Sequence, residues 1–215
     1  MGRRALPKID PELDLNGIFF ISDDLPEVFD QEAMFGRIAP LEVEVGSGKG
    51  MFLQSTAPDN PSHDFIGIEI AQKYARLIAS RVKKHDITNV CSIGGDAEPL
   101  FATWFPSNHL HAVHVYFPDP WWKKRHRKRR VLNEKFLRNV QRVLRPTGQL
   151  HFWTDVQEYF ETSLELIAEV TTLAGPLTVK ERDPEHDMDY HTHFERRKRK
   201  DGLPIYRSVF EKKAE

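Results

Sequence analysis

LEVEVGSGKG, residues 41–50, is the segment that decides the fold expected for this chain. Its first five residues are typical of a strand, and the three glycines at every second position predict a tight turn into a short helix. Glycine there lets the backbone turn sharply and lets a ligand approach it closely. The segment lacks the GxGxxG spacing of dinucleotide-binding loops, and Lys49 is not followed by the serine or threonine of a P-loop. An ATP or dinucleotide site is therefore disfavoured.

Patterns of strand and helix alternate along the chain after this segment. Alternation at this spacing predicts an α/β fold, a doubly wound, mostly parallel sheet flanked by helices in the Rossmann-like manner. Ligands of such a sheet bind beyond the carboxyl ends of the strands, so the residues that follow each strand are candidates for a site. Further strands are expected at 64–70, 89–95, 109–117 and 148–154, and helices near 50–57 and at 72–85, 131–144 and 156–170.

The composition is that of an ordinary globular protein of 215 residues, with 40% hydrophobic and 29% charged residues. No apolar run is long enough to cross a membrane and no signal-peptide pattern is present, so we expect a soluble, cytoplasmic chain. The single cysteine, Cys91, excludes an internal disulfide and lies in a strand pattern typical of a structural thiol. Residues 1–30 are expected to form a mobile or loosely docked N-terminal arm, and residues 31–215 one domain.

Two basic runs stand out in a chain whose formal net charge is only −1. KKRHRKRR at 123–130 holds seven Lys or Arg residues without an acid, and RRKRK at 196–200 holds five. Like charges repel at helical spacings, so the first run is not typical of an ordinary helix face. Its density indicates a local contact with a polyanion such as the phosphates of RNA. We expect the second run to be an exposed loop.

Acidic side chains lie in or after four of the predicted strands. Glu69 ends the second strand, where a carboxylate can accept hydrogen bonds from both hydroxyls of a ribose, and Asp96 follows the third. Carboxylates at these turns disfavour a phosphorylated ligand and suit a nucleoside that carries positive charge. S-adenosylmethionine fits this description, because it has an adenosine, no phosphate, a sulfonium and an amino group that Glu44 or Asp119 could balance.

In the residues at these strand ends, the chain resembles the tRNA (guanine-N7)-methyltransferases. The resemblance runs from about residue 35 to the end, and FPDPWWKKRHRKRR at 117–130 is its most specific part. It implies a class I methyltransferase fold with a seven-stranded sheet, S-adenosylmethionine as cofactor and tRNA as partner, with the variable-loop guanosine at position 46 as target. The other matching segments are LEVEVGSGKG, FIGIEI (65–70), GGDAE (94–98), FWTD (152–155), THFE (192–195) and GLPIYRSVFEK (202–212).

The resemblance also implies roles for individual residues. Asp119 would be the catalytic residue and would contact the cofactor as well. No membrane or metal is implied, and we expect a monomer or a homodimer. The other cofactor contacts would be Glu44, Gly46, Gly48, Glu69 and Asp96, the substrate contacts Lys123, Asp155, Thr192, His193, Phe194 and Glu195, and the RNA contacts Arg125, His126, Arg127, Lys128, Arg129 and Arg130.

The chemistry of guanine N7 limits what Asp119 has to do. N7 has an in-plane lone pair and no proton, so its methylation needs no base before transfer. Holding N7 in line with the methyl group, and negative charge near the ring, would accelerate the step. We therefore interpret Asp119 as an orienting and electrostatic residue, held between Pro118 and Pro120. Trp121 or Trp122 could stack on the base or ribose, or fill the core under the loop.

Two other functions are compatible with the sequence. One is a methyltransferase that acts on an amino group of another nucleic acid or of a protein. The other is an RNA-binding module that keeps the fold without catalysis, although Gly46, Gly48, Glu69 and Asp119 are intact and argue against it.

The histidines of the chain suggest no metal site. HDMDYHTHFE at 186–195 collects three histidines and several acids, but methyl transfer needs no metal and no other motif completes a site. We interpret His109, His111 and His114 as histidines that share one face of a strand or lie at its ends.

Overall fold

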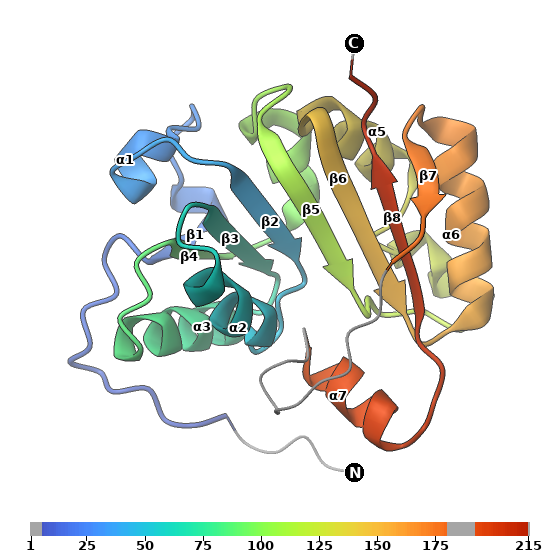
Figure 1. Ribbon diagram of the computed structural model, residues 1–215. Coiled ribbons are helices and arrows are strands. Elements are labelled where there is room, and N and C mark those ends of the chain that lie inside the picture. The colour runs from blue at the N-terminus through green and yellow to red at the C-terminus, as the bar shows by residue number, and fades with distance from the viewer. Residues whose placement is uncertain (1–5, 180–191, 215) are drawn as a thin grey trace.

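The computed structural model describes residues 6–179 and 192–214, which contain one eight-stranded sheet in the order β1-β4-β3-β2-β5-β6-β8-β7 (Figure 1). The first six strands in this order are parallel to one another, β8 is antiparallel to β6, and β7 is antiparallel to β8. The strands are β1 (Phe19–Ile21), β2 (Leu41–Val45), β3 (Asp64–Glu69), β4 (Val90–Gly94), β5 (Leu110–Tyr116), β6 (Leu144–Thr154), β7 (Ala174–Leu177) and β8 (Tyr206–Glu211).

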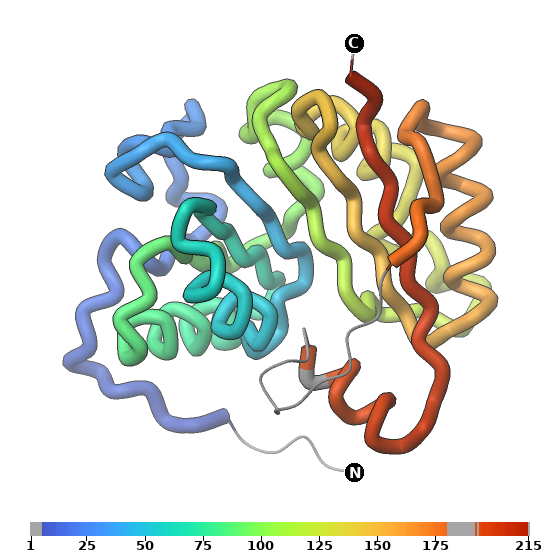
Figure 2. The backbone as a smooth tube through the Cα atoms, viewed as in Figure 1, coloured from blue at the N-terminus to red at the C-terminus, as the bar shows by residue number. Residues whose placement is uncertain are grey.

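Helices lie on both faces of this sheet, so the doubly wound arrangement expected from the sequence is confirmed (Figures 1 and 2). The helical segments are η1 (Ser22–Asp24), α1 (Gln31–Phe35), α2 (Met51–Asp59), α3 (Gln72–Lys84), α4 (Ala97–Pro99), η2 (Leu100–Trp104), η3 (Lys124–Arg129), α5 (Glu134–Val143), α6 (Gln157–Val170) and α7 (His193–Lys200). One hydrophobic core joins the sheet to α2 and α3, and a larger one joins it to α5 and α6. None of the helices in the described ranges is long and apolar enough to span a bilayer.

Strand β2 distributes its side chains between these two faces. Leu41, Val43 and Val45 lie in the larger core, so Glu42 and Glu44 project to the opposite face. Burial alone would raise the pKa of the Glu42 carboxyl, but hydrogen bonds and charge from two histidines lower it to about 2. For Glu44, burial and the Glu69 carboxylate instead raise the pKa of the carboxyl to about 8.

The N-terminal segment differs from the arm that we expected over residues 1–30. Phe19–Ile21 pairs in parallel with β4, beginning with Phe19 opposite Ser92, and Phe29 is buried in the larger core. The sheet therefore has eight strands among the described residues rather than seven, and the expected arm does not extend to residue 30. A strand of three residues is too short for a period-2 pattern to be recognised in the sequence.

The second basic run is part of a helix, α7, rather than the exposed loop that we expected. Thr192 caps this helix, because its hydroxyl oxygen accepts a hydrogen bond from the Glu195 N–H at 2.9 Å. The four cations of its last turn lie where the helix dipole favours positive charge. Ion pairs with acidic side chains relieve their mutual repulsion, as Lys198 does with Asp155 at 2.7 Å.

Candidate active site

The carboxyl ends of the parallel strands meet at one edge of the sheet, the lower edge in Figure 1. The loop after β2 turns there through Gly46, Gly48 and Gly50, whose φ angles of 80°, 54° and 71° lie in the region that favours glycine. The Glu69 carboxylate ties this loop to the end of β3, accepting hydrogen bonds from the Gly48 N–H at 2.9 Å and the Ala71 N–H at 3.0 Å. A Cβ atom on Gly46 would meet nothing within 4 Å, so the loop of residues 46–50, the glycine cradle, has room for a ligand.

Glu44, the residue before the end of β2, has one oxygen without a partner. Its side chain is 3% exposed, and Oε2 accepts no hydrogen bond from any residue that the structure describes. Burial, with a smaller contribution from the Glu69 carboxylate, raises the pKa of Glu44 to about 8. A buried carboxylate oxygen without a donor is costly, so a cationic group beside Oε2 would be strongly favoured. The unpaired oxygen and the open glycine cradle together fit the amino group and the nucleoside of S-adenosylmethionine.

Asp96 follows β4 at the same edge. Its carboxylate accepts a hydrogen bond from the Glu98 N–H at 3.0 Å and so caps α4, while the side chain remains exposed. The Gly95 N–H donates to the Glu69 carbonyl oxygen at 3.0 Å, which joins the turn after β4 to the turn after β3. The five residues expected to bind the cofactor besides Asp119 thus lie in or next to three turns that hydrogen bonds connect.

The loop after β5, residues 117–122, is strained on both sides of Asp119. Phe117 and Trp121 have φ angles of 49° and 45°, a left-handed conformation that bulky residues rarely adopt. Such a conformation costs about 1–3 kcal/mol per residue and is often found at functional sites. Asp119 itself is exposed and has no hydrogen bond or ion pair with any described residue. Its carboxylate is held on a constrained turn and is available to a ligand.

Arg130, which we expected to bind RNA, holds this loop instead. Its guanidinium donates to the Pro120 carbonyl oxygen at 2.8 Å and forms an ion pair with Glu158 at 2.9 Å. The group also lies 4.3 Å from the ring centroid of Tyr159, and the residue is only 8% exposed. A guanidinium with these partners does not belong with the cations that can reach a phosphate.

The other residues of the first basic run form the short turn η3 and its flanks. His126 stacks on Trp121 with ring centroids 5.8 Å apart, and the Arg129 guanidinium lies 5.1 Å from the same ring. The Trp121 ring is thus engaged in contacts within the protein, whereas the Trp122 side chain is 69% exposed. The cations that remain exposed are Lys123, Lys124, Arg125, Arg127, Lys128 and Arg129.

Helix α7 lies next to the same edge of the sheet and contacts the ends of two strands (Figure 1). Phe194 stacks on Phe117, with ring centroids 5.9 Å apart, and so reaches the loop that carries Asp119. The Lys198 ammonium pairs with Asp155, which follows β6. Phe194 is 49% exposed, and the Arg197 guanidinium lies 5.7 Å from the centroid of its ring.

Two residues of the segment THFE support α7 rather than face a substrate. Thr192 caps the helix, and Glu195 is 3% exposed and pairs with Arg207 at 3.3 Å. His193 begins the helix, but its side chain lies outside the described part of the structure. Among the residues of this segment whose side chains the structure describes, Phe194 is the most exposed.

The sequence of this chain is similar to that of known enzymes. A family model described as a putative methyltransferase matches residues 38–208. The tRNA (guanine-N(7)-)-methyltransferase of Rhodopirellula baltica is 50% identical over 220 residues, a match that covers 100% of this chain and 81% of that protein. This chain belongs to the tRNA (guanine-N7)-methyltransferase family. The protein of the same name from Alcanivorax borkumensis is 37% identical over 186 residues, covering 85% of this chain and 77% of its own length.

Solved structures support the same fold for this family member. The 16S rRNA methyltransferase KamB has a TM-score of 0.64 at 17% identity, covering 91% of this chain and 99% of that one. An antibiotic-related methyltransferase has a TM-score of 0.60 at 18% identity, covering 84% of this chain and 92% of that one. These likenesses confirm the class I methyltransferase fold expected from the sequence, apart from the number of strands.

Three residues that contact this candidate site were not recognised from the sequence. Lys198 lies within a run of five cations, and nothing in the sequence separates it from its neighbours. Arg207 lies in the segment 202–212, for which the sequence offered only the resemblance to the family. Phe117 could have been suspected, because it begins the most specific motif, but its contact with Phe194 joins segments far apart in the chain.

Proposed function

We propose that this protein transfers the methyl group of S-adenosylmethionine to N7 of guanosine at position 46, in the variable loop of tRNA. The observation that carries the proposal is the exposed Asp119 carboxylate on a strained turn, next to a row of exposed cations and at the strand ends where the glycine cradle lies. Membership in the family supports the reaction, and the position in tRNA rests on the resemblance.

The turns after β2, β3 and β4 would hold the cofactor. Glu44 has an unpaired oxygen for the amino group, and the Glu69 carboxylate has lone pairs left for the ribose hydroxyls after its two backbone hydrogen bonds. Gly46 and Gly48 allow the ligand to approach the backbone. S-adenosylmethionine, when bound, supplies a methyl group on a positively charged sulfur.

Asp119 would align the guanine. A carboxylate accepts two parallel hydrogen bonds, which match N1–H and the exocyclic amine of this base, and it attracts the positive charge that develops on the ring. Pro118, Pro120 and the contact of Arg130 with the Pro120 carbonyl oxygen limit how far the carboxylate can move. A constrained acceptor of this kind costs little reorganisation during the reaction.

The surface next to this turn suits a nucleic acid. Exposed cations from Lys123 to Arg129 would contact phosphates, which supply affinity and register but no sequence information. Trp122 is 69% exposed and offers an aromatic ring on which a nucleobase could stack.

Incubation of the full chain with labelled S-adenosylmethionine and an unmodified tRNA transcript tests this function. After nuclease digestion we expect the label in 7-methylguanosine, and we expect none in a matched transcript that carries adenosine at position 46. Label in an amino-methylated nucleoside would favour the amino-group methyltransferase, and a complete lack of 7-methylguanosine would exclude the proposal.

Replacing Arg127, Lys128 and Arg129 together by alanine should weaken tRNA binding and flatten its salt dependence. Each phosphate contact contributes a slope of about −0.7 to −0.9 in log affinity against log salt concentration, so the loss of three contacts changes this slope by about 2 to 3. Arg127 also pairs with Glu158 and Arg129 lies over Trp121, so three full contacts set the upper limit of the change. Binding of tRNA at several salt concentrations measures the slope.

A matched control is the replacement of Lys83 and Lys84, which are exposed cations at the far end of α3. Their loss removes charge from the opposite end of the strands and should leave the slope nearly unchanged. An equal loss of slope in both variants would contradict a contact localised at η3.

A further inference from the structure

The amino-terminal edge of the sheet, opposite the methyltransferase site, carries a second group of polar side chains. Glu42 comes from β2, His63 directly precedes β3, and His111 comes from β5. One ligand atom from each of the three lies within 4.8 Å of the others. All three side chains are partly buried, and none of them was assigned to the cofactor or the RNA.

An irregularity in β5 brings the histidines to Glu42. Residues three positions apart in a regular strand project to opposite faces, so His111 and His114 should diverge. The register between β2 and β5 shifts, however, so that Leu41 pairs with Leu110 while Glu42 pairs with Ala112. This bulge leaves His111 as an extra residue and directs it to the same carboxylate that His114 contacts.

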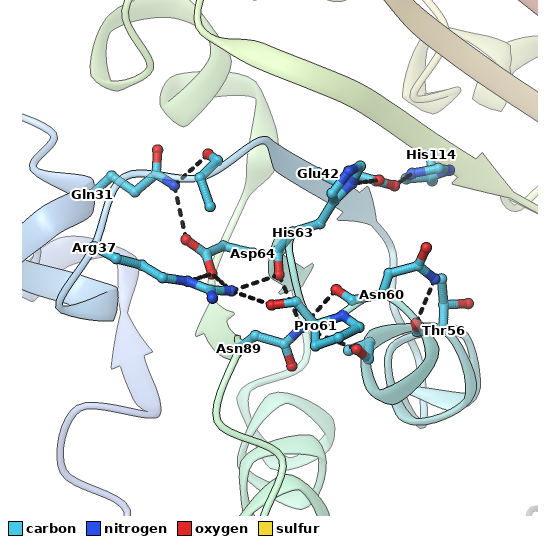
Figure 3. Close-up of polar contacts among 12 residues, drawn as sticks. Gln31, Arg37, Glu42, Thr56, Asn60, Pro61, His63, Asp64, Asn89 and His114 are labelled. Carbon is cyan, nitrogen blue, oxygen red and sulfur yellow. Dashed lines mark hydrogen bonds and ion pairs between the residues drawn. The ribbon is translucent and has the colours of Figure 1, made fainter.

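The contacts within this group leave a buried nitrogen of His111 without a partner among the described residues. Glu42 Oε1 lies 2.6 Å from His63 Nδ1, and Oε2 lies 2.7 Å from His114 Nε2 (Figure 3). The His111 ring is nearly perpendicular to the His63 ring, with centroids 4.9 Å apart. Its Nδ1 atom is buried and has no hydrogen bond with any described residue. A buried imidazole nitrogen without a donor or acceptor costs free energy that a ligand would recover.

The backbone beside His63 is held firmly. The carbonyl oxygen of His63 accepts hydrogen bonds from Asn89 Nδ2 at 2.9 Å and from Arg37 Nη2 at 3.1 Å (Figure 3). The next residue, Asp64, is fully buried and pairs with Arg37 at 2.7 Å. His63 is therefore presented to Glu42 from a constrained loop, as a preorganised ligand requires.

We propose that Glu42, His63 and His111 bind one divalent transition-metal ion, with Zn²⁺ as the best chemical match. Two imidazoles and a carboxylate with an open fourth position form a recognised zinc ligand set, with metal–ligand distances of about 2.0–2.2 Å. Tetrahedral coordination separates ligand atoms by about 3.3 Å. The ion would therefore replace the 2.6 Å hydrogen bond between Glu42 Oε1 and His63 Nδ1, and atoms now up to 4.8 Å apart would move closer.

The surroundings of the three ligands suit this role. His114 contacts the second oxygen of Glu42, and the Tyr116 hydroxyl in turn lies 2.8 Å from His114 Nδ1. Such outer partners orient a ligating carboxylate. The positive charge of Arg145 acts on His111 and disfavours a bound cation, whereas the negative charge of Glu42 favours one. The bound ion would join β2, β3 and β5 at the edge away from the methyltransferase site, and its effect would be on stability.

Metal titration of the untagged full-length protein, stripped with a chelator, tests this site. We expect one Zn²⁺ per chain and a higher Tm in its presence, and Co²⁺ should give the visible absorption of a tetrahedral ion. His111→Ala and the isosteric Glu42→Gln should each weaken binding at least about tenfold. Two control variants should bind as the wild type does: His85→Ala, at an exposed position after α3, and the double variant His186→Ala, His191→Ala.

Two results would overturn the proposal. One is a wild-type protein that takes up no Zn²⁺ or Co²⁺ at micromolar concentrations. The other is uptake that is unchanged by both His111→Ala and Glu42→Gln, because the ion would then be bound elsewhere. Methyl transfer is measured separately, with and without chelator, and should be equal, so failure of this site is distinct from failure of the proposed function.

Discussion

Replacing Asp119 by alanine is expected to lower the rate constant of methyl transfer by about 10²- to 10³-fold, the usual loss when one preorganised electrostatic group is removed. The affinity for tRNA should change little, because the exposed cations of the first basic run supply most of it. Single-turnover rates at saturating tRNA measure the first quantity, and equilibrium binding at fixed salt concentration measures the second.

Asp119→Asn is the matched control for this experiment. Asparagine keeps the size of the side chain and one acceptor oxygen but loses the negative charge. If Asp119 acts by alignment and charge, the asparagine variant should retain more activity than the alanine variant and less than the wild type. A nearly full rate in the alanine variant would contradict the role, and so would a loss of tRNA affinity equal to that of the triple variant at Arg127, Lys128 and Arg129.

Replacing Glu44 by glutamine is expected to weaken cofactor binding and to stabilise the cofactor-free protein at alkaline pH. The carboxyl has a pKa of about 8 in the folded protein and 4.5 as its reference value. Folding therefore favours the protonated form, and stability falls as the pH rises from about 4.5 to about 8. Glutamine removes this loss, which is roughly 3–5 kcal/mol when complete.

The cofactor should respond in the opposite direction. Loss of one partner from a buried charge pair costs about 2–5 kcal/mol, so the Kd for S-adenosylmethionine should rise by roughly 30-fold or more. Calorimetric titration measures this Kd, and denaturant unfolding at pH 5 and pH 8.5 measures the stability. A Glu44→Gln protein with the pH dependence of the wild type would show that Glu44 is not the titrating group.

Most of the sheet was predictable because its elements have strong local patterns. The expected strands over 41–45, 64–70 and 89–95 differ from the observed ones by at most one residue at each end, and the helix expected over 72–85 ends one residue earlier. β1 and β7 are too short for such a pattern, and in α7 the capping residue Thr192 outweighs a run of like charges that suggested a loop.

The sequence by itself determined which chemical groups gather at the active-site edge. In a parallel sheet all carboxyl ends lie together, so the order of Glu44, Glu69, Asp96 and Asp119 along the chain already predicts their proximity. Which of several similar side chains is buried was decided by the tertiary structure alone. Arg130 is buried while Arg129 is exposed, and a bulge directs His111 to Glu42. These outcomes depend on contacts between segments far apart in the chain, which no local pattern encodes.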